Sequence, residues 1–322
     1  MPDTDTPTDT AALDLPDDAE LHVLVPSRAL GEHLEQVSPR VRAHRVDPAA
    51  GAPTGDAARA QVWVPAGGSD IPEGFLEGLP DLRLVQLMSA GAEKFVGRLP
   101  AGVVLCNARG AHTPATAEWV VAAALAAQRG LPHFTREQDA GRWAPGTERS
   151  LVGARVLVVG AGDIGRTVGR MLAGFDVDLT FVARSARDGV RATADLPDLL
   201  PAADVVVVVV PVTDETVGLV DAGFLAAMKD GALLVNVARG VVVDTDALLA
   251  ELTAGRLRAA LDVTDPEPLP TGHPLWSAPG LLLTPHVAGA VPGTGARAFA
   301  AVADQVQRVL AGRPPVNVVD RY

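Results

Sequence analysis

The chain has 322 residues, of which 48% are hydrophobic and 20% charged, and its formal net charge is −12. This length and composition predict two globular domains, each with a sizeable core. The negative charge argues against binding to nucleic acid or to an anionic membrane surface. It also means that an anionic ligand needs a local cationic site. The single cysteine, Cys106, excludes an intrachain disulfide bond.

The first twenty residues are acidic and rich in Thr, Pro and Asp. They have neither the cationic start nor the apolar stretch of a secretory signal, and we expect residues 1–19 to form a disordered tail. The apolar run Val205–Val210 is too short to span a bilayer and predicts a strand buried on both faces of a parallel sheet. We therefore expect a cytoplasmic protein with no membrane partner.

Short apolar runs separated by turn-rich stretches follow the tail and predict a small parallel α/β unit. They are Leu21–Val25, Gln61–Val64, Leu82–Leu87 and Val103–Cys106. The Ala-rich segment from Thr116 to Gln128 predicts a long buried helix, because Thr113-Pro114 precedes it and Gly130 and Pro132 follow it.

From Arg155 onward strands and helices alternate, which predicts a doubly wound parallel sheet. The expected strands are Arg155–Val159, Asp178–Ala183, Val205–Val210, Ala232–Val237, Ala259–Val263 and Leu281–Thr284. The expected helices between them are Ile164–Phe175, Asp221–Met228 and Thr245–Ala254. A last helix, Thr294–Leu310, has apolar positions at helical spacing, and its packing against the first unit would make that domain discontinuous.

A glycine-rich turn, Gly160-Ala161-Gly162-Asp163-Ile164-Gly165, joins a valine-rich strand to a helix. This context predicts a dinucleotide site and leaves a turn without a ligand as the alternative. Gly160 permits the tight turn, Gly162 lets the backbone approach a pyrophosphate, and Gly165 lets the helix pack against the strand. The N–H groups at the start of the helix, at Asp163 and Ile164, would bind the phosphates.

The second strand of the dinucleotide unit lacks the acidic residue that usually binds the ribose 2′-hydroxyl of NAD. It ends in Ala183, Arg184 and Ser185, and Asp188 lies too far beyond the strand end to be a substitute. Arg184 would bind a 2′-phosphate through charge-assisted hydrogen bonds, with help from Ser185 and Arg187. The sequence thus favours NADP (NADPH) over NAD, the alternative being that these are solvated loop arginines.

Several separated segments, taken in order, resemble the D-isomer-specific 2-hydroxyacid dehydrogenases, and among them the glyoxylate/hydroxypyruvate reductases. Besides the glycine turn, they are Asn236-Val237-Ala238-Arg239-Gly240, Leu261-Asp262-Val263 with Glu267-Pro268-Leu269, and Thr284-Pro285-His286-Val287-Ala288-Gly289. The resemblance runs from about Leu82 to about Val319 and is strongest between Gly160 and Gly289.

The resemblance implies three catalytic residues whose chemistry is also reasonable from first principles. His286 would exchange the proton of the substrate hydroxyl, and Glu267 would stabilise the protonated imidazole. Arg239 would bind the substrate carboxylate and polarise the carbonyl oxygen. Each taken singly has an ordinary structural alternative, and Asp265 is a nearby competitor of Glu267 with a shorter side chain.

The resemblance also implies binding residues around this centre and no metal ion. Asp262 would hydrogen-bond the nicotinamide carboxamide with help from the Ala238 carbonyl, and Pro211 would line the cofactor cleft. The segment Met88–Ala92 resembles the family's substrate-carboxylate loop, in which Ser89, Ala90 and Gly91 would offer backbone N–H groups and clamp the substrate together with Arg239. A simple strand-to-helix turn is the alternative for this loop.

The implied fold is α/β: a doubly wound Rossmann dinucleotide-binding domain, residues 111–290, and a smaller flavodoxin-like α/β substrate domain, residues 20–110 and 291–322. We expect a homodimer, with the Ala-rich helix as a dimer element. The expected function is hydride transfer between a nicotinamide cofactor and a small D-2-hydroxy or 2-oxo acid, with NADPH reducing glyoxylate or hydroxypyruvate. Alternatives are a non-catalytic NAD(P)-sensing or corepressor-like protein and a phosphite or phosphoglycerate dehydrogenase relative. Formate is disfavoured because formate-type members carry glutamine where Glu267 stands.

Overall fold

The computed structural model describes residues 15–16 and 18–319, which form two compact units. One unit contains the chain up to His112 and again from Pro292, and the other contains Thr113–Val291. Most of the segment expected to be a disordered tail lies outside the described residues. Of its described part, Leu15 packs against the core of the first unit, and Arg40 donates one hydrogen bond to the carbonyl of Ala19 and one to that of Pro16.

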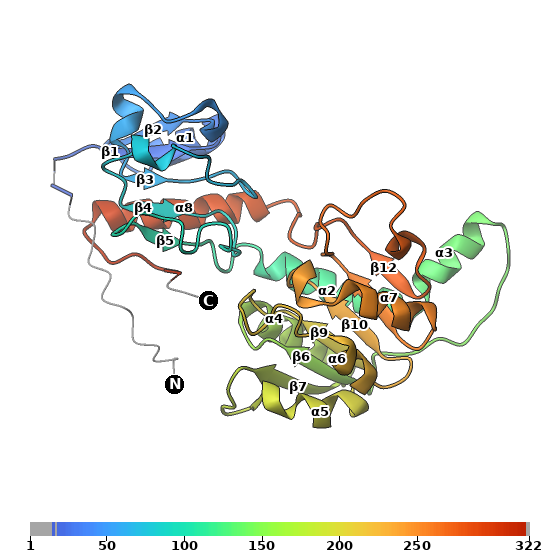
Figure 1. Cartoon of the computed structure of the whole chain (residues 1–322). Coiled ribbons are helices and arrows are strands. Elements are labelled where there is room, and N and C mark those ends of the chain that lie inside the picture. The colour runs from blue at the N-terminus through green and yellow to red at the C-terminus, as the bar shows by residue number, and fades with distance from the viewer. Residues whose placement is uncertain (1–14, 17, 320–322) are drawn as a thin grey trace. The chain divides into compact units, whose positions relative to one another are not determined.

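The first unit is built on a five-stranded sheet in the order β2-β1-β3-β4-β5, and all pairings are parallel (Figure 1). Its strands are β1 (Leu21–Val25), β2 (Val41–Arg45), β3 (Val62–Trp63), β4 (Leu84–Gln86) and β5 (Val104–Cys106). Alternate residues of β1 enter cores on opposite faces, so that Val23 packs on one side and Leu24 on the other. The sheet is therefore covered on both faces.

Two helices cover one face of this sheet, and loops with short helical turns cover the other. The helices are α1 (Arg28–Glu35), which begins at the N-cap Ser27, and α8 (Thr294–Leu310). Val302 and Val306 of α8 join the core formed by β1 and β4, which explains why the end of the chain belongs to this unit (Figure 1). On the opposite face the Trp63 ring packs against two phenylalanine rings.

The second unit contains a seven-stranded parallel sheet in the order β12-β11-β10-β9-β6-β7-β8 (Figure 1). Its strands are β6 (Arg155–Val159), β7 (Asp178–Ala183), β8 (Val190–Ala192), β9 (Val205–Val208), β10 (Leu233–Asn236), β11 (Arg258–Leu261) and β12 (Leu281–Leu283). The chain runs outward from β6 to β8, then crosses to β9 and continues in the other direction. Such a reversal of strand order places a ligand crevice at the carboxyl ends of β6 and β9.

Helices cover both faces of this larger sheet. On one face lie α2 (Thr113–Gln128) and α4 (Asp163–Leu172), and on the other lie α5 (Leu196–Leu199), α6 (Ala222–Ala227) and α7 (Thr245–Thr253). Val205 and Val207 of β9 pack toward α2 and α4, whereas Val206 and Val208 pack toward the other helices. The helix α3 (Leu131–Asp139) has no buried residue and stands away from the sheet of this unit (Figure 1).

The predicted parallel α/β fold class is confirmed, and the differences concern edges and ends. The strand expected at Val205–Val210 ends at Val208, and the run Leu82–Leu87 yields only the three residues of β4. Two strands and three α-helices were not expected as separate elements: β2, β8, α1, α3 and α5. β2 and β8 are edge strands with partly exposed residues, so neither shows the apolar run that marked the central strands.

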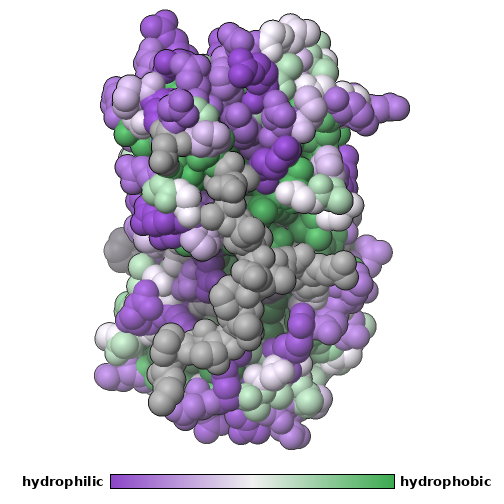
Figure 2. Space-filling view, turned by 90° about the vertical axis from the view of Figure 1, so that its left-hand side faces the viewer, coloured by the Kyte–Doolittle hydropathy of each residue, from purple (hydrophilic) through white to green (hydrophobic). Residues whose placement is uncertain are grey.

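The surface in Figure 2 shows hydrophilic residues over much of the viewed face, with hydrophobic residues interspersed. Across the part of the chain that the structure describes, no helix combines the length and apolar character needed to cross a membrane. The same residues contain no group of three or more His, Cys, Asp or Glu side chains that could hold a metal ion.

A pair of stacked histidines joins β1 to β2 in the smaller unit. Their facing nitrogens, Nδ1 of His22 and Nε2 of His44, lie 2.9 Å apart, so one must donate and the other accept. Burial and the neighbouring His22 lower the pKa of His44 from its ordinary value of 6.5, against the raising effect of Asp56 and Glu35. A proton on both rings would remove the only acceptor in this contact and place two cations together.

We predict that stability falls as the pH drops below about 6.5, the ordinary histidine pKa, through the depressed pKa of folded His44. In that window the unfolded chain binds more protons than the folded chain, so acid favours unfolding. Urea unfolding at pH 7 and pH 5 should show a smaller pH dependence in His44→Gln than in the unsubstituted protein. An identical pH dependence in both would contradict the assignment.

Candidate active site

Predicted site residues follow the ends of three neighbouring strands. β10, β11 and β12 are adjacent and parallel, and Arg239, Asp262 and His286 follow their carboxyl ends. Because parallel strands present their carboxyl ends at one edge, the fold gathers these residues at the same end of the sheet.

The structure pairs His286 with Glu267. Nδ1 of His286 lies 2.6 Å from Oε1 of Glu267, and the two side chains are 47% and 40% exposed. Glu267 rather than its competitor Asp265 therefore supplies the carboxylate at the imidazole. His286 has φ of +54°, a left-handed conformation that is uncommon outside glycine and that occurs preferentially at functional sites.

The buried carboxylate of Asp262 holds the backbone on both sides of His286. Its Oδ1 accepts hydrogen bonds from the Thr284 hydroxyl at 2.6 Å and from the N–H of Val287 at 2.8 Å, and its Oδ2 accepts one from the N–H of Ala288 at 2.9 Å. The Asp262 carbonyl accepts a further bond from the N–H of His286 at 2.7 Å. Three of about four acceptor positions of the carboxylate are thus used within the protein, so its geometry supports a positioning role more than the expected contact with nicotinamide.

A cavity of about 300 Å³ borders the histidine–glutamate pair. Glu267, His286 and Thr264 supply polar groups to its wall, whereas Leu269, Trp276 and Leu283 supply apolar surface. The indole N–H of Trp276 donates to the carbonyl of Pro270 at 2.9 Å, which fixes the ring. This combination of an apolar wall with a few convergent polar groups is typical of small-molecule sites.

The turn that carries Arg239 is built by the side chain of Asn236, which is 1% exposed. Its Nδ2 donates to the carbonyl of Arg239 at 3.0 Å, and its Oδ1 accepts from the N–H of Ala238 at 3.0 Å. The sequence motif contains Asn236, but its role in holding the Arg239 turn was not predicted. Arg239 donates through Nη1 to the carbonyl of Ala238 at 2.7 Å, so the acceptor expected to assist nicotinamide binding is engaged by the arginine.

Gly240 brings the Arg239 turn against the segment that leads to Glu267. A Cβ atom built on Gly240 would lie 1.9 Å from the carbonyl oxygen of Thr264, so no larger residue fits without displacing backbone. The hydroxyl of Thr245 also donates to the Asp265 carbonyl at 2.8 Å across the same two segments. Sequence analysis did not assign a role to Gly240, because this close approach depends on a partner distant in sequence.

The three glycines of the dinucleotide turn have different constraints. Gly160 has φ of +119°, and a Cβ on Gly165 would lie 2.0 Å from the Gly160 carbonyl oxygen, so the protein itself requires both. Gly162 has an ordinary φ of −81°, and no protein atom lies within 4 Å of a Cβ built on it. Among the described residues, no acceptor takes the N–H groups of Gly162 or Ile164. The turn therefore fits a bound pyrophosphate, which would account for glycine at 162.

The predicted 2′-phosphate residues follow β7. Arg184 forms an ion pair, with 2.7 Å between its Nε and Oε2 of Glu215. Glu215 was not among the predicted site residues. The backbone of Arg187 exchanges hydrogen bonds with Val190, which sets the turn into β8, and Ser185 lies between the two arginines. Pro211 follows β9 at the same edge of the sheet and accepts a hydrogen bond from the Thr216 hydroxyl at 2.6 Å.

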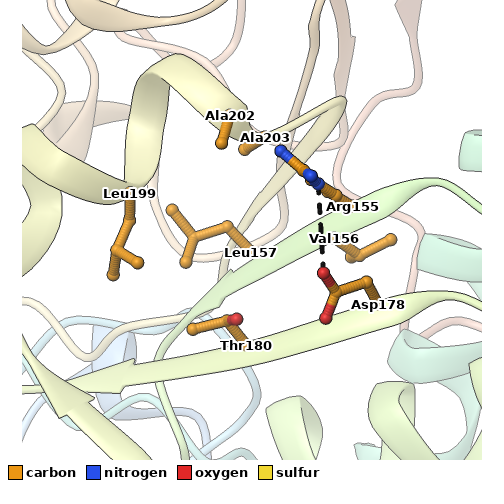
Figure 3. Close-up of a pocket in the computed structure, with 8 residues that line it drawn as sticks. All are labelled: Arg155, Val156, Leu157, Asp178, Thr180, Leu199, Ala202 and Ala203. Atoms are coloured by element: carbon orange, nitrogen blue, oxygen red, sulfur yellow. Dashed lines mark ion pairs between the residues drawn. The ribbon is translucent and has the colours of Figure 1, made fainter.

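A second cavity, of about 180 Å³, lies at the opposite edge of the sheet (Figure 3). Arg155 and Asp178, which begin β6 and β7, face each other there, with 3.9 Å between Nε and Oδ2. Leu157, Leu199 and Thr180 line the cavity beside this ion pair (Figure 3). The cavity contains none of the predicted site residues and its two charged groups neutralise each other, so the carboxyl edge remains the candidate site.

The predicted carboxylate loop belongs to the smaller unit. Its shape is fixed by hydrogen bonds from the Ser89 hydroxyl to the Gly91 carbonyl at 3.0 Å and from Asn107 Nδ2 to the Ala90 carbonyl at 2.8 Å. Within the described part of the chain, the N–H groups of Ser89 and Gly91 have no acceptor. They are available to an anion, as a carboxylate-binding loop requires.

Comparison with known proteins shows which family the chain resembles. Residues 121–288 match the model of the D-isomer-specific 2-hydroxyacid dehydrogenase NAD-binding domain. A D-3-phosphoglycerate dehydrogenase of Archaeoglobus fulgidus is 34% identical over 230 residues, which cover 68% of this chain and 43% of that protein. A glyoxylate/hydroxypyruvate reductase B of Citrobacter koseri is 33% identical over 264 residues, which cover 78% of this chain and 82% of that protein.

A solved structure extends the similarity to both units. It is a D-isomer-specific 2-hydroxyacid dehydrogenase from Xanthobacter autotrophicus Py2 in complex with NADPH and MES. It matches with a TM-score of 0.82 at 32% identity and covers 94% of this chain and 98% of that chain. The chain therefore belongs to the D-isomer-specific 2-hydroxyacid dehydrogenases and is an NAD(P)-dependent oxidoreductase of that family.

Proposed function

We propose that the protein reduces a small 2-oxo acid, glyoxylate or hydroxypyruvate, and that it prefers NADPH. The observation that carries this proposal is the 2.6 Å contact of His286 with Glu267 at the wall of the cavity. The Citrobacter relative named glyoxylate/hydroxypyruvate reductase B supports the substrate class.

His286 serves as the proton donor. Its Nδ1 is held by Glu267, which leaves Nε2 as the nitrogen that exchanges a proton with the substrate oxygen. The carboxylate stabilises the imidazolium that reduction of a ketone requires, and it fixes the orientation of the ring. When the substrate oxygen takes the proton, the neutral imidazole keeps its hydrogen bond to Glu267.

Arg239 binds the substrate carboxylate and stabilises charge on the carbonyl oxygen. The guanidinium binds the carboxylate either beside its contact with the Ala238 carbonyl or in place of that contact. In both cases the hydrogen bond from Asn236 to the Arg239 carbonyl holds the turn in place. In the smaller unit, the N–H groups of Ser89 and Gly91 have no acceptor among the described residues and can bind an anion there. The nicotinamide would supply the hydride when it is bound. Asp262 keeps the His286 segment in position through its hydrogen bonds to the N–H groups of Val287 and Ala288.

The preference for NADPH is supported by the end of β7. The carboxyl end of this strand carries no carboxylate that would repel a 2′-phosphate, and Arg184 and Arg187 supply positive charge. The similar Xanthobacter enzyme was solved with NADPH.

Substitutions in the His286–Glu267 pair test the proposed proton transfer. His286→Ala should lower glyoxylate- or hydroxypyruvate-dependent NADPH oxidation by at least about a hundredfold, the usual contribution of a general acid, while the Kd of NADPH stays nearly unchanged. Glu267→Gln should also lower kcat, because the imidazolium loses its anion. The matched control is Asp265→Asn, an exposed acid of the same loop, which should retain activity. Retained turnover in His286→Ala would remove this residue from the mechanism.

Substitution of Arg184 tests the proposed preference for NADPH. Arg184→Ala should weaken NADPH much more than NADH, because only the former presents a 2′-phosphate. The control is Arg191→Ala. Arg191 lies on β8, the strand after β7, and forms an ion pair with Asp195. Fluorescence titration with both nucleotides measures the effect, and equal losses for the two would refute the role of Arg184.

We further propose that the protein is a homodimer formed through α2 and the segment that follows it. This region carries large apolar side chains in contact with solvent: Leu131 is 53% exposed, Trp143 is 97% exposed and Val152 is 64% exposed. Apolar groups exposed together in one segment are typical of an interaction surface.

The combined substitution Leu131→Glu and Trp143→Ser should shift the protein from dimer toward monomer in sedimentation velocity. Val217→Ser, at an apolar residue of similar exposure after β9, should leave the distribution unchanged. A monomeric unsubstituted protein would contradict the proposal.

A further inference from the structure

The ion pair of Arg184 with Glu215 lies in the cofactor region but is not explained by the role assigned to the arginine. Nε of Arg184 and Oε2 of Glu215 are 2.7 Å apart, and both side chains are about two-thirds exposed, at 67% and 64%. Exposed pairs of this kind contribute little to stability. The charges of this pair therefore affect a ligand bound beside them more than they affect the stability of the fold.

The position of the pair follows from the topology. Arg184 follows β7 and Glu215 follows β9, and these two strands flank β6, whose own loop is the glycine turn. The ion pair thus joins the loops on either side of that turn, at the carboxyl edge of the sheet. In dinucleotide-binding units the adenosine ribose lies at the end of the second strand, which here is β7.

The backbone at Glu215 is held in a fixed turn. Its N–H donates to the Thr213 hydroxyl at 3.2 Å, the N–H of Thr213 donates to the Thr216 hydroxyl at 2.8 Å, and that hydroxyl donates to the Pro211 carbonyl at 2.6 Å. Thr213 is buried. A change at Glu215 therefore alters the charge and reach of one side chain without releasing the loop.

We propose that Glu215 is a specificity-determining residue that limits the preference for NADPH over NADH; this inference rests on the proposed NADPH-dependent function. Glu215 neutralises Arg184 before a nucleotide binds. A 2′-phosphate must displace Glu215 from the guanidinium and then remains close to a carboxylate of the same sign. Both effects oppose NADPH.

NADH encounters Glu215 differently. Its ribose presents a neutral 2′-hydroxyl, which can donate a hydrogen bond to a carboxylate. The strand end after β7 lacks the acid that usually accepts this bond. Glu215, supplied from the neighbouring loop, is placed to take over that function, so its charge opposes one cofactor without opposing the other.

The test compares Kd values for NADPH and NADH by fluorescence titration of the nucleotide-free full chain, which does not depend on turnover. Glu215→Gln should lower the Kd of NADPH about three- to tenfold, equivalent to about 0.7–1.4 kcal/mol, and should not lower the Kd of NADH. The gain should diminish at high salt, because these charges are exposed. Glu215→Ala is a second variant in case the first does not fold.

The matched control is Asp214→Asn. Asp214 is an exposed acid of the same turn and forms no ion pair with the described residues, so its neutralisation removes the same charge without releasing Arg184. It should change the ratio of the two Kd values by less than about twofold, the Coulomb effect of a more distant charge in water. If Glu215→Gln changes the ratio of the NADH Kd to the NADPH Kd by no more than Asp214→Asn does, the inference is overturned.

The outcomes separate this inference from the proposed function. If the unsubstituted protein binds neither nucleotide, both are wrong. If NADPH binds and Arg184→Ala weakens it selectively, but Glu215→Gln leaves the ratio unchanged, the cofactor assignment stands and the role of Glu215 is refuted.

Discussion

The proposed catalytic end of the larger unit depends on one buried carboxylate. Asp262 is 3% exposed and accepts hydrogen bonds from the Thr284 hydroxyl and from two successive N–H groups after His286. Hydrogen bonds to a charged group contribute about 1.5–3 kcal/mol each, and a buried carboxylate deprived of its donors is costly. The loop after β12 is therefore fixed relative to β11, and the left-handed backbone of His286 persists because its surroundings determine it.

A parallel sheet turns this local constraint into a site. β10, β11 and β12 end side by side, so the Arg239 turn, the Asp262 network and the His286 loop share one edge. The segment between β11 and β12 adds Glu267 at the imidazole and Trp276 at the cavity wall. The reversal of strand order at β6 places the glycine turn and the Arg184–Glu215 pair at the same edge of this sheet. The residues proposed for cofactor binding and those proposed for proton transfer thus lie at one edge of one sheet.

The sequence predicted the central strands and the candidate residues because their signals are local. Val205–Val208 is apolar throughout, and Gly160 and Gly165 stand at fixed spacing between a strand and a helix. It could not predict the partners that folding brings from elsewhere. Glu215 meets Arg184 from a different loop, and the need for glycine at 240 arises from the Thr264 carbonyl. The edge strands β2 and β8 were missed because their residues are partly exposed and lack the apolar run of a buried strand.

The close approach at Gly240 couples the two segments that carry Arg239 and Glu267. A Cβ atom at position 240 would lie 1.9 Å from the Thr264 carbonyl oxygen, so neither segment can gain bulk at this contact without displacing the other. A substitution that moves either segment toward this contact therefore also moves the other, which makes the positions of Arg239 and Glu267 interdependent.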